Sequence, residues 1–210
     1  MDRCLIAKAG WFYIGIWLVV TAAIFYWAGW FGLIPGILLL FCLFFFRNPP
    51  RKIKVDKNLV LSPADGKVMS IQEWEDEFMG GKCYKVSIFL SVFNVHVNRF
   101  PVEAELVSLD YRPGQFLPAF KSHASEINEK NVLSLKSEQH NFRVAQITGF
   151  VARRIRCYVR PGDCLKQGQR FGIILFGSCT EIMVPLECQI RIKEGDKVKG
   201  GVTIIGQFSD

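Results

Sequence analysis

The sequence predicts a mainly β protein: an N-terminal transmembrane or membrane-dipping helical hairpin, followed by a β-sandwich or barrel-like domain. Residues 9–46 carry no charged side chain, which predicts apolar helices. From about residue 58 onward, short apolar runs alternate with turns rich in Gly, Pro and Asp, as is typical of strands. We therefore divide the chain into residues 1–57, the anchoring hairpin with a basic linker, and residues 58–210, the β-rich domain.

Composition narrows the classes of function. The chain has 210 residues, 50% of them hydrophobic, which is enough for one soluble domain and a membrane segment. A net charge of +7 suits either nucleic acid or lipid, and the apolar segment favours an anionic membrane surface, with no nucleic acid as partner. The seven cysteines form no Cys-x-x-Cys pair and there are three histidines, so we expect neither a disulfide framework nor a metal site.

The apolar run is about twice as long as the roughly 20 residues that one helix needs to cross a bilayer. Trp27–Trp30 and Pro35-Gly36 interrupt it, so we expect helices at about 11–27 and 33–46. The second helix is short, which leaves open whether the hairpin spans the bilayer or dips into one leaflet; a buried core hairpin is the alternative. Basic residues on both flanks place both ends on the cytoplasmic face. They are Arg3, Lys8, Arg47, Arg51, Lys52 and Lys54.

The β-rich domain is expected to start at Leu59. A turn, Ser-Pro-Ala-Asp-Gly at 62–66, follows the first strand, and an acidic loop ending in Gly80-Gly81 separates the next two strands. Residues 122–130 are expected to form a short helix or a loop. The strands expected before residue 160 are 59–61, 67–72, 84–90, 102–110, 141–150 and 153–159.

The stretch Gly168–Pro185 is where chemistry is expected. It predicts two buried strands, Phe171–Phe176 and Glu181–Val184, joined by a tight connection at Gly177-Ser178-Cys179. A serine after a conformationally free glycine can have an attackable carbonyl beside its own hydroxyl. A Gly-Ser pair alone is most often an ordinary turn, so the rest of the chain must support this interpretation.

A turn pattern occurs twice near the C-terminus. The segment Arg160–Gly168, with its Gly-Asp turn and final glycine, is echoed by Lys193–Gly201, and each is followed by an apolar run, 171–175 and 202–205. Such turns resemble those of lipoyl- and biotinyl-type sandwich domains, which predicts a pseudo-symmetric β-sandwich. Carrier domains place a lysine in the hairpin between the two halves, and this chain has Gly177-Ser178-Cys179-Thr180 there.

Two chemical routes would make Ser178 reactive. In the first, Ser178 is a conventional nucleophile, His96 is its base, and Asp65 orients the imidazole. The alternative for these partners is structural: His96 ends a strand and Asp65 makes hydrogen bonds within its own turn. In the second route, the Ser178 hydroxyl attacks the Gly177 carbonyl, the amide becomes an ester, and elimination followed by hydrolysis leaves a pyruvoyl group.

The other candidate side chains are expected to be structural. Cys179 is a rival nucleophile beside Ser178, but no basic neighbour in sequence lowers its pKa, so we interpret it as a packing residue. His123 and His140 lie in polar stretches and are expected to be solvated. The basic cluster Arg153-Arg154-x-Arg156 is either a solvated strand face or a contact for lipid phosphates.

Several ordered motifs resemble the short, membrane-associated branch of the phosphatidylserine decarboxylase proenzymes. They extend across nearly the whole chain after the hairpin and are far more specific than the Gly-Ser pair. The motifs are Phe45–Pro49, Ser62–Val68, Leu90–Arg99, Ala124–Glu129, Val151–Ile155, Gly168–Ile173 and Phe176–Ser178.

The resemblance implies roles for particular residues. It implies cleavage between Gly177 and Ser178 into a large chain, 1–177, and a small chain, 178–210, with Ser178 converted into a pyruvoyl cofactor. It also implies that Asp65 and a histidine, here His96, assist maturation. In the longer branch two histidines three residues apart divide maturation and decarboxylation between them. This chain departs from that pattern at Arg99, and Cys179 stands where this branch is expected to have Arg.

The expected activity is pyruvoyl-dependent decarboxylation of phosphatidylserine to phosphatidylethanolamine and carbon dioxide in phospholipid biosynthesis. The ketone would condense with the substrate amine and act as an electron sink while the carboxylate leaves. A related serine lipid is a variant of the same chemistry, and a homo-oligomer stays open. The alternative functions are a membrane-tethered serine protease and a non-catalytic lipoyl-like membrane adaptor.

Overall fold

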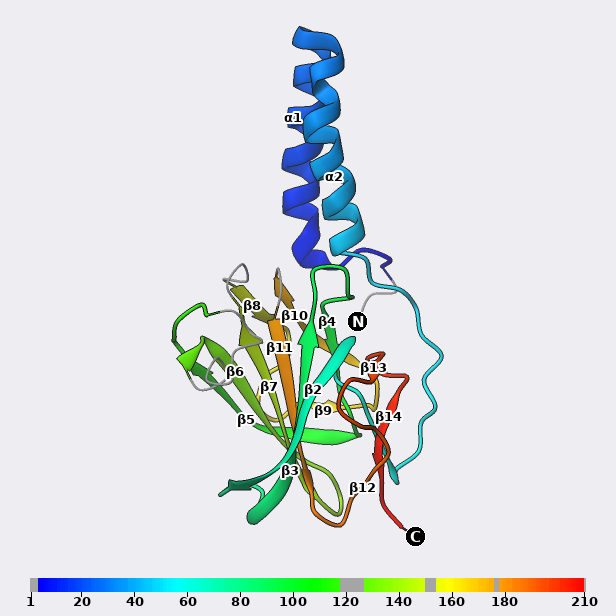
Figure 1. Cartoon of the computed structure of the whole chain (residues 1–210), viewed down its shortest axis with the longest axis vertical. Helices are drawn as coiled ribbons and strands as arrows, with labels where there is room; N and C mark the ends of the chain where they lie inside the picture. The colour runs from blue at the N-terminus through cyan, green and yellow to red at the C-terminus, as the bar shows by residue number, and fades with distance from the viewer. Residues whose placement is uncertain (1–3, 118–126, 150–153, 176–177, 210) are drawn as a thin grey trace. The chain divides into compact units, whose positions relative to one another are not determined.

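The computed structural model describes residues 4–117, 127–149, 154–175 and 178–209 (Figure 1). It confirms a mainly β protein with apolar N-terminal helices, and its contacts divide the chain into two units, Met1–Pro50 and Arg51–Asp210. By its contacts the linker, residues 51–57, groups with the β unit, and the functional division at residue 57 stays a prediction. There, the backbone N–H of Asp56 donates a hydrogen bond to the side-chain oxygen of Gln167 over 2.9 Å.

The first unit is a helical hairpin in which α1 (Trp11–Ala28) and α2 (Leu33–Phe45) lie side by side (Figure 1). Short 3-10 helices, η1 (Lys8–Gly10) and η2 (Gly29–Gly32), precede each of them. α1 ends at Gly29, whose φ of 57° a residue with a side chain rarely adopts. The helices expected at about 11–27 and 33–46 are thus present at those positions.

The two ends of the hairpin are held together within this unit. Gly10 allows the close approach of Phe46, because a Cβ at position 10 would lie 2.4 Å from the Phe46 ring. Phe46 also stacks on Tyr13 with ring centroids 5.5 Å apart. Most large apolar side chains of both helices are exposed within the unit, and the segment Lys8–Phe45 is long and apolar enough to cross a membrane.

The second unit consists of three sheets. A curled eight-stranded sheet has the order β13-β2-β3-β11-β7-β6-β5-β9, and the two three-stranded sheets have the orders β1-β14-β12 and β4-β10-β8. The strands are β1 (Leu59–Leu61), β2 (Gly66–Asp76), β3 (Gly81–Leu90), β4 (Val97–Arg99), β5 (Ala104–Arg112), β6 (Lys130–Lys136), β7 (Asn141–Thr148), β8 (Arg154–Cys157), β9 (Cys164–Leu165), β10 (Arg170–Leu175), β11 (Ser178–Pro185), β12 (Gln189–Ile190), β13 (Lys197–Val198) and β14 (Ile204–Gln207).

The apolar core lies between the large sheet and the two small sheets. Ile182 at the centre of β11 and Val144 on β7 pack in one cluster with Val60 of β1 and Phe171 of β10, all of them buried. Because side chains alternate along a strand, every second residue of β11 enters this core, and the residues between them face the outer side of the sheet. The face that a residue takes in β11 therefore decides whether it meets the core.

The prediction that Ser178 lies in a turn between strands is wrong. β11 begins at Ser178, because that residue pairs with Leu90 on one side and with Thr148 on the other. Two further differences concern the strands. The expected acidic loop is mostly strand, since β2 extends to Asp76 along β3, and β6 was not predicted. Residues 122–126 of the expected helix or loop lie outside the described residues.

The repeated turns make matching contacts in the structure. In each copy the Gly-Asp turn exchanges two backbone hydrogen bonds with one strand residue, Leu106 of β5 in the first copy and Val68 of β2 in the second. Gly162 and Gly195 both have φ of 91°. The two-residue strands that follow, β9 and β13, form the opposite edges of the eight-stranded sheet. The likeness to lipoyl-type sandwiches remains a prediction.

The central position of Ile182 gives a test of this core. Ile182→Ala is expected to lower the free energy of unfolding by roughly 2–5 kcal/mol, because it leaves a cavity among fully buried side chains. Met183→Ala is the matched control, since the neighbouring side chain faces the other side of the sheet and is only half-buried. Urea denaturation of the full chain in detergent measures both, and equal losses would contradict the assigned orientation of β11.

Candidate active site

Ser178 is the first residue of β11, held between the ends of β3 and β7. Its side chain is fully buried, and its Oγ has no hydrogen-bond partner among the described residues. A buried hydroxyl without a partner costs roughly 1–3 kcal/mol, and an apolar side chain at this position would avoid that cost. Gly177, the other residue of the expected cleavage site, lies outside the described residues.

Cys179 points away from Ser178, because consecutive residues of a strand face opposite sides. It lies in a small apolar cluster with Ile147, Ala145 and Val132 on the outer side of the sheet. Complete burial raises the pKa of its thiol well above the usual value of 9.0, so the thiol stays protonated at neutral pH. These contacts agree with Cys179 as a packing residue and not as a nucleophile.

His96 is buried at the start of β4, next to β10. Its backbone oxygen accepts a hydrogen bond from the N–H of Ile174 over 3.3 Å. Its ring Nδ1 lies 3.0 Å from the backbone oxygen of Asn94, which can accept but not donate, so Nδ1 carries the proton of this hydrogen bond and Nε2 is the basic nitrogen of the neutral ring. The loop 91–96 thus connects the strand that pairs with Ser178 to the strand beside β10.

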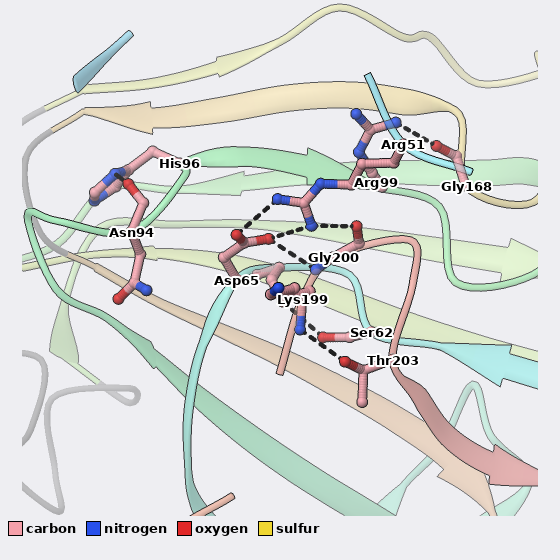
Figure 2. A network of polar contacts seen from close by, with 11 residues as sticks. Arg51, Ser62, Asp65, Asn94, His96, Arg99, Gly168, Lys199, Gly200 and Thr203 are labelled. Carbon is pink, nitrogen blue, oxygen red and sulfur yellow. Dashed lines mark hydrogen bonds and ion pairs between the residues drawn. The ribbon is translucent and has the colours of Figure 1, made fainter. Parts of the chain in front are cut away.

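Asp65 has partners other than His96. Arg51 binds both of its carboxylate oxygens, over 2.6 and 2.7 Å, and the N–H of Gly200 donates to it over 2.8 Å (Figure 2). Arg51 also donates to the backbone oxygen of Gly200 over 2.7 Å. Figure 2 draws no hydrogen bond between Asp65 and His96, whose imidazole lies apart beside Asn94. The structure therefore places Asp65 in a clamp that joins the linker to the turn before β14.

Arg99 extends this charged cluster. Its guanidinium donates to the backbone oxygen of Gly168 over 3.0 Å and is almost completely buried. Burial, together with repulsion from Arg170 and Arg51, lowers the pKa of Arg99 to about 10, although the negative charge of Asp65 raises it in part. Arg99 therefore remains a cation at neutral pH and cannot replace a histidine as a base.

Four buried polar residues near Ser178 were missed by the sequence analysis. Asn131, Gln146, Asn98 and Thr180 come from four different strands and form one hydrogen-bonded chain beneath the sheet. Gly172 makes room for it, because a Cβ there would lie 2.8 Å from the Gln146 amide nitrogen. A glutamine inside the apolar run of β7 was the available signal, but its partners are distant in sequence.

The remaining candidates lie elsewhere. His140 stacks on Phe208, with ring centroids 4.2 Å apart, in the wall of a separate cavity of about 260 Å³. Arg154 and Arg156 have exposed side chains on β8, whereas His123 and Arg153 lie outside the described residues. In the part of the chain that the structure describes, no group of three His, Cys, Asp or Glu side chains is arranged to hold a metal ion.

Comparison with known proteins places this chain in a family. The family model for phosphatidylserine decarboxylase matches residues 38–206, which include Asp65, His96 and Ser178. A phosphatidylserine decarboxylase proenzyme of Carboxydothermus hydrogenoformans is 49% identical over 92% of this chain and 94% of its own length. Proenzymes of the same name from Symbiobacterium thermophilum (44% identical, covering 99% and 98%) and Syntrophus aciditrophicus (42%, covering 94% and 94%) are also similar. The chain belongs to the phosphatidylserine decarboxylase family.

Proposed function

We propose that this chain is a proenzyme that cleaves itself between Gly177 and Ser178 and then decarboxylates phosphatidylserine to phosphatidylethanolamine and carbon dioxide. The family supplies the reaction class. The observation that carries the self-cleavage is the Ser178 hydroxyl, buried at the start of the central strand without a hydrogen-bond partner among the described residues. A hydroxyl held this way is available for reaction with its own backbone.

The residues around Ser178 fit a pyruvoyl group formed from that serine. The side chain enters a buried face of the sheet from which bulk water is excluded, and Cys179 beside it faces the other way. A pyruvoyl group supplies a ketone that withdraws electrons from a condensed substrate amine, the part that pyridoxal phosphate plays elsewhere. The chain's own task is then to place residue 178, exclude water and move protons.

Self-cleavage of this kind balances without an external oxidant. The Ser178 oxygen bonds to the Gly177 carbonyl carbon, the peptide C–N bond breaks, and the hydroxyl proton passes to the nitrogen. A base then removes the Cα proton of residue 178, and the Cβ–Oγ bond breaks, so that Gly177 leaves as a carboxylate. One water molecule is added to the resulting dehydroalanine and one ammonia is lost.

His96 is the proposed base, and Asp65 is a positioning residue. The hydrogen bond from Nδ1 of His96 to Asn94 fixes the tautomer in which Nε2 can accept a proton. Asp65 and Arg51 bind the backbone at Gly200, which belongs to the proposed small chain. This clamp would hold the small chain to the large chain after cleavage.

The hairpin is proposed to attach the enzyme to the cytoplasmic face of the cell membrane. Its helices expose large apolar side chains such as Trp27 and Trp30, which are 84% and 82% exposed and suit an interfacial position. The basic linker that follows, with Lys52 and Lys54, would favour an anionic lipid surface. Attachment would allow a lipid headgroup to be processed without leaving the interface.

Intact mass under denaturing conditions is the experiment that tests the proposal. Purified protein is expected to separate into two chains, the smaller spanning residues 178–210 and carrying an N-terminal pyruvoyl group instead of serine. Ser178→Ala is expected to remain a single chain without decarboxylase activity, because it lacks the attacking oxygen. A single wild-type chain that still decarboxylates phosphatidylserine would sink the pyruvoyl mechanism.

The same preparation separates the alternatives. Borohydride or hydroxylamine should inactivate the mature enzyme, because both reagents react with an essential ketone. A serine protease or a non-catalytic adaptor has no such carbonyl and would be insensitive to both reagents.

The role of His96 is tested by the rate of maturation. His96→Gln is expected to slow chain cleavage by roughly 100-fold or more, because the glutamine amide cannot accept a proton at neutral pH. Cleavage of protein synthesised in vitro can be followed on gels. His140→Gln is the control, since that ring stacks on Phe208 in a separate cavity. Equal rates for His96→Gln and the wild type would remove His96 from maturation.

Membrane attachment predicts resistance to extraction. The protein is expected to stay with the membrane pellet in alkaline carbonate and in high salt, because apolar helices are held by the hydrocarbon and not by charge. Release by high salt alone would contradict the hairpin anchor and favour electrostatic attachment.

A further inference from the structure

The hydrogen bonds that link the buried polar side chains beside Ser178 all run in one direction, from donor to acceptor. The side-chain amide of Asn131 donates to the Gln146 oxygen over 3.2 Å, Gln146 donates to the Asn98 oxygen over 2.8 Å, and Asn98 donates to the Thr180 hydroxyl over 3.1 Å. All four side chains are buried. Hydrogen bonds aligned in one direction polarise one another, and each amide fixes the orientation of the next.

Thr180 is the last residue of this series of hydrogen bonds, and it lies on the same face of β11 as Ser178. Its hydroxyl oxygen accepts the hydrogen bond from Asn98, so its one proton remains to be donated. Within the described part of the chain, no acceptor is recorded for that proton. The two neighbours of Thr180 along this face of the strand are Ile182, which is apolar, and Ser178, whose oxygen also lacks a described partner. A polarised donor thus stands beside the residue that would be cleaved.

The other half of the fold serves as an internal control for this polar layer. The matched turn contacts at Leu106 and Val68 align β5, β6 and β7 with β2, β3 and β11. The strand pairings then give each polar residue a counterpart in the other half: Tyr84 for Asn131, Val184 for Gln146 and Phe142 for Thr180.

The counterpart of Asn98 is Val60, because Asn98 pairs with Gly172 of β10 and Val60 pairs with Gly206 of β14.

All four counterparts are apolar or aromatic and belong to the core or pack against it. The architecture therefore does not require amides at these positions. Three buried amides also have to be desolvated, whereas apolar side chains do not. The polar layer occurs in the half whose strand begins with Ser178, and in the other half the equivalent position is His140.

We propose that Asn131, Gln146 and Asn98 hold the Thr180 hydroxyl as a donor to the Ser178 oxygen during self-cleavage. This inference rests on the proposed function. When the Cβ–Oγ bond breaks, the electron pair stays with that oxygen, which becomes part of the Gly177 carboxylate, and the Cα proton passes to the base. The Thr180 hydroxyl, held on the same face of β11, would turn its proton to that oxygen as the charge develops and stabilise it. Asn98 and Gln146 act through Thr180 as positioning residues.

The test is the maturation of Thr180→Val, which keeps the shape of the side chain and removes its hydroxyl. Cleavage is expected to slow by roughly 100- to 1,000-fold, the range found for the loss of one donor from an oxyanion site. Because the defect lies in the elimination, the ester formed in the first step should accumulate. Hydroxylamine traps it, releasing a fragment that begins with unmodified Ser178 and one that ends in a hydroxamate at Gly177, both identified by mass.

Matched variants separate this role from a structural one. Thr180→Ser restores the hydroxyl and should mature within about threefold of the wild type. Thr148→Val is the control: it removes another fully buried hydroxyl, but one whose proton is donated to the Glu129 backbone oxygen over 3.1 Å. It should build up no ester. Melting temperatures of Thr180→Val and Thr148→Val in the uncleavable Ser178→Ala protein show whether both fold equally well.

A second variant tests orientation while keeping the Thr180 hydroxyl. Asn98→Asp replaces the donor with an acceptor, so the Thr180 proton would turn towards position 98 and away from Ser178. Ester accumulation is expected here as well. If the wild type cleaves itself and Thr180→Val cleaves equally fast with no ester trapped, this proposal alone is overturned. Wild-type protein that never cleaves would overturn the proposed function and this inference together.

Discussion

The pairing of β11 on both sides is the constraint on which the β unit depends. It lies at the middle of the eight-stranded sheet, bonded to β3 along its whole length and to β7 along most of it. These two ladders fix the register, and the register decides that Ser178, Thr180 and Ile182 share the buried face. A shift of one residue would bring Cys179 and Glu181 inward instead. The candidate chemistry and the core are thus set by the same hydrogen bonds.

The molecule uses one architecture twice, for different purposes. Around the midpoint of β11 and β7, Ile182 faces Val144, and apolar side chains continue from there in one direction. In the other direction the layer becomes polar, through Thr180 and Gln146, and ends at the partnerless hydroxyl of Ser178. One end of the sheet face is therefore built for stability, and the other accepts a cost in stability.

The sequence predicted what is local. The hairpin followed from a long uncharged run with a break near its middle, and the repeated turns followed from the spacing of Gly and Asp; both depend on neighbouring residues alone. Ser178 was assigned to a turn because it follows Gly177 between two apolar runs, whereas pairing with β3 and β7 makes it the first residue of β11. A single sequence cannot reveal contacts between distant segments. Two examples are the ion pair of Asp65 with Arg51 and the hydrogen bonds that lead from Asn131 to Thr180.

The position of the expected cut, immediately before the central strand, makes assembly a one-way process. Uncut, the chain folds as one polymer in which β11 is tethered to β10 by a short link, so the loss of entropy on inserting it is small. After a cut the sheet would survive on its existing bonds, but a denatured molecule would have to recruit its central strand from solution. Such an enzyme would be kinetically stable: its fold would persist once formed, but the cleaved protein would not refold after denaturation.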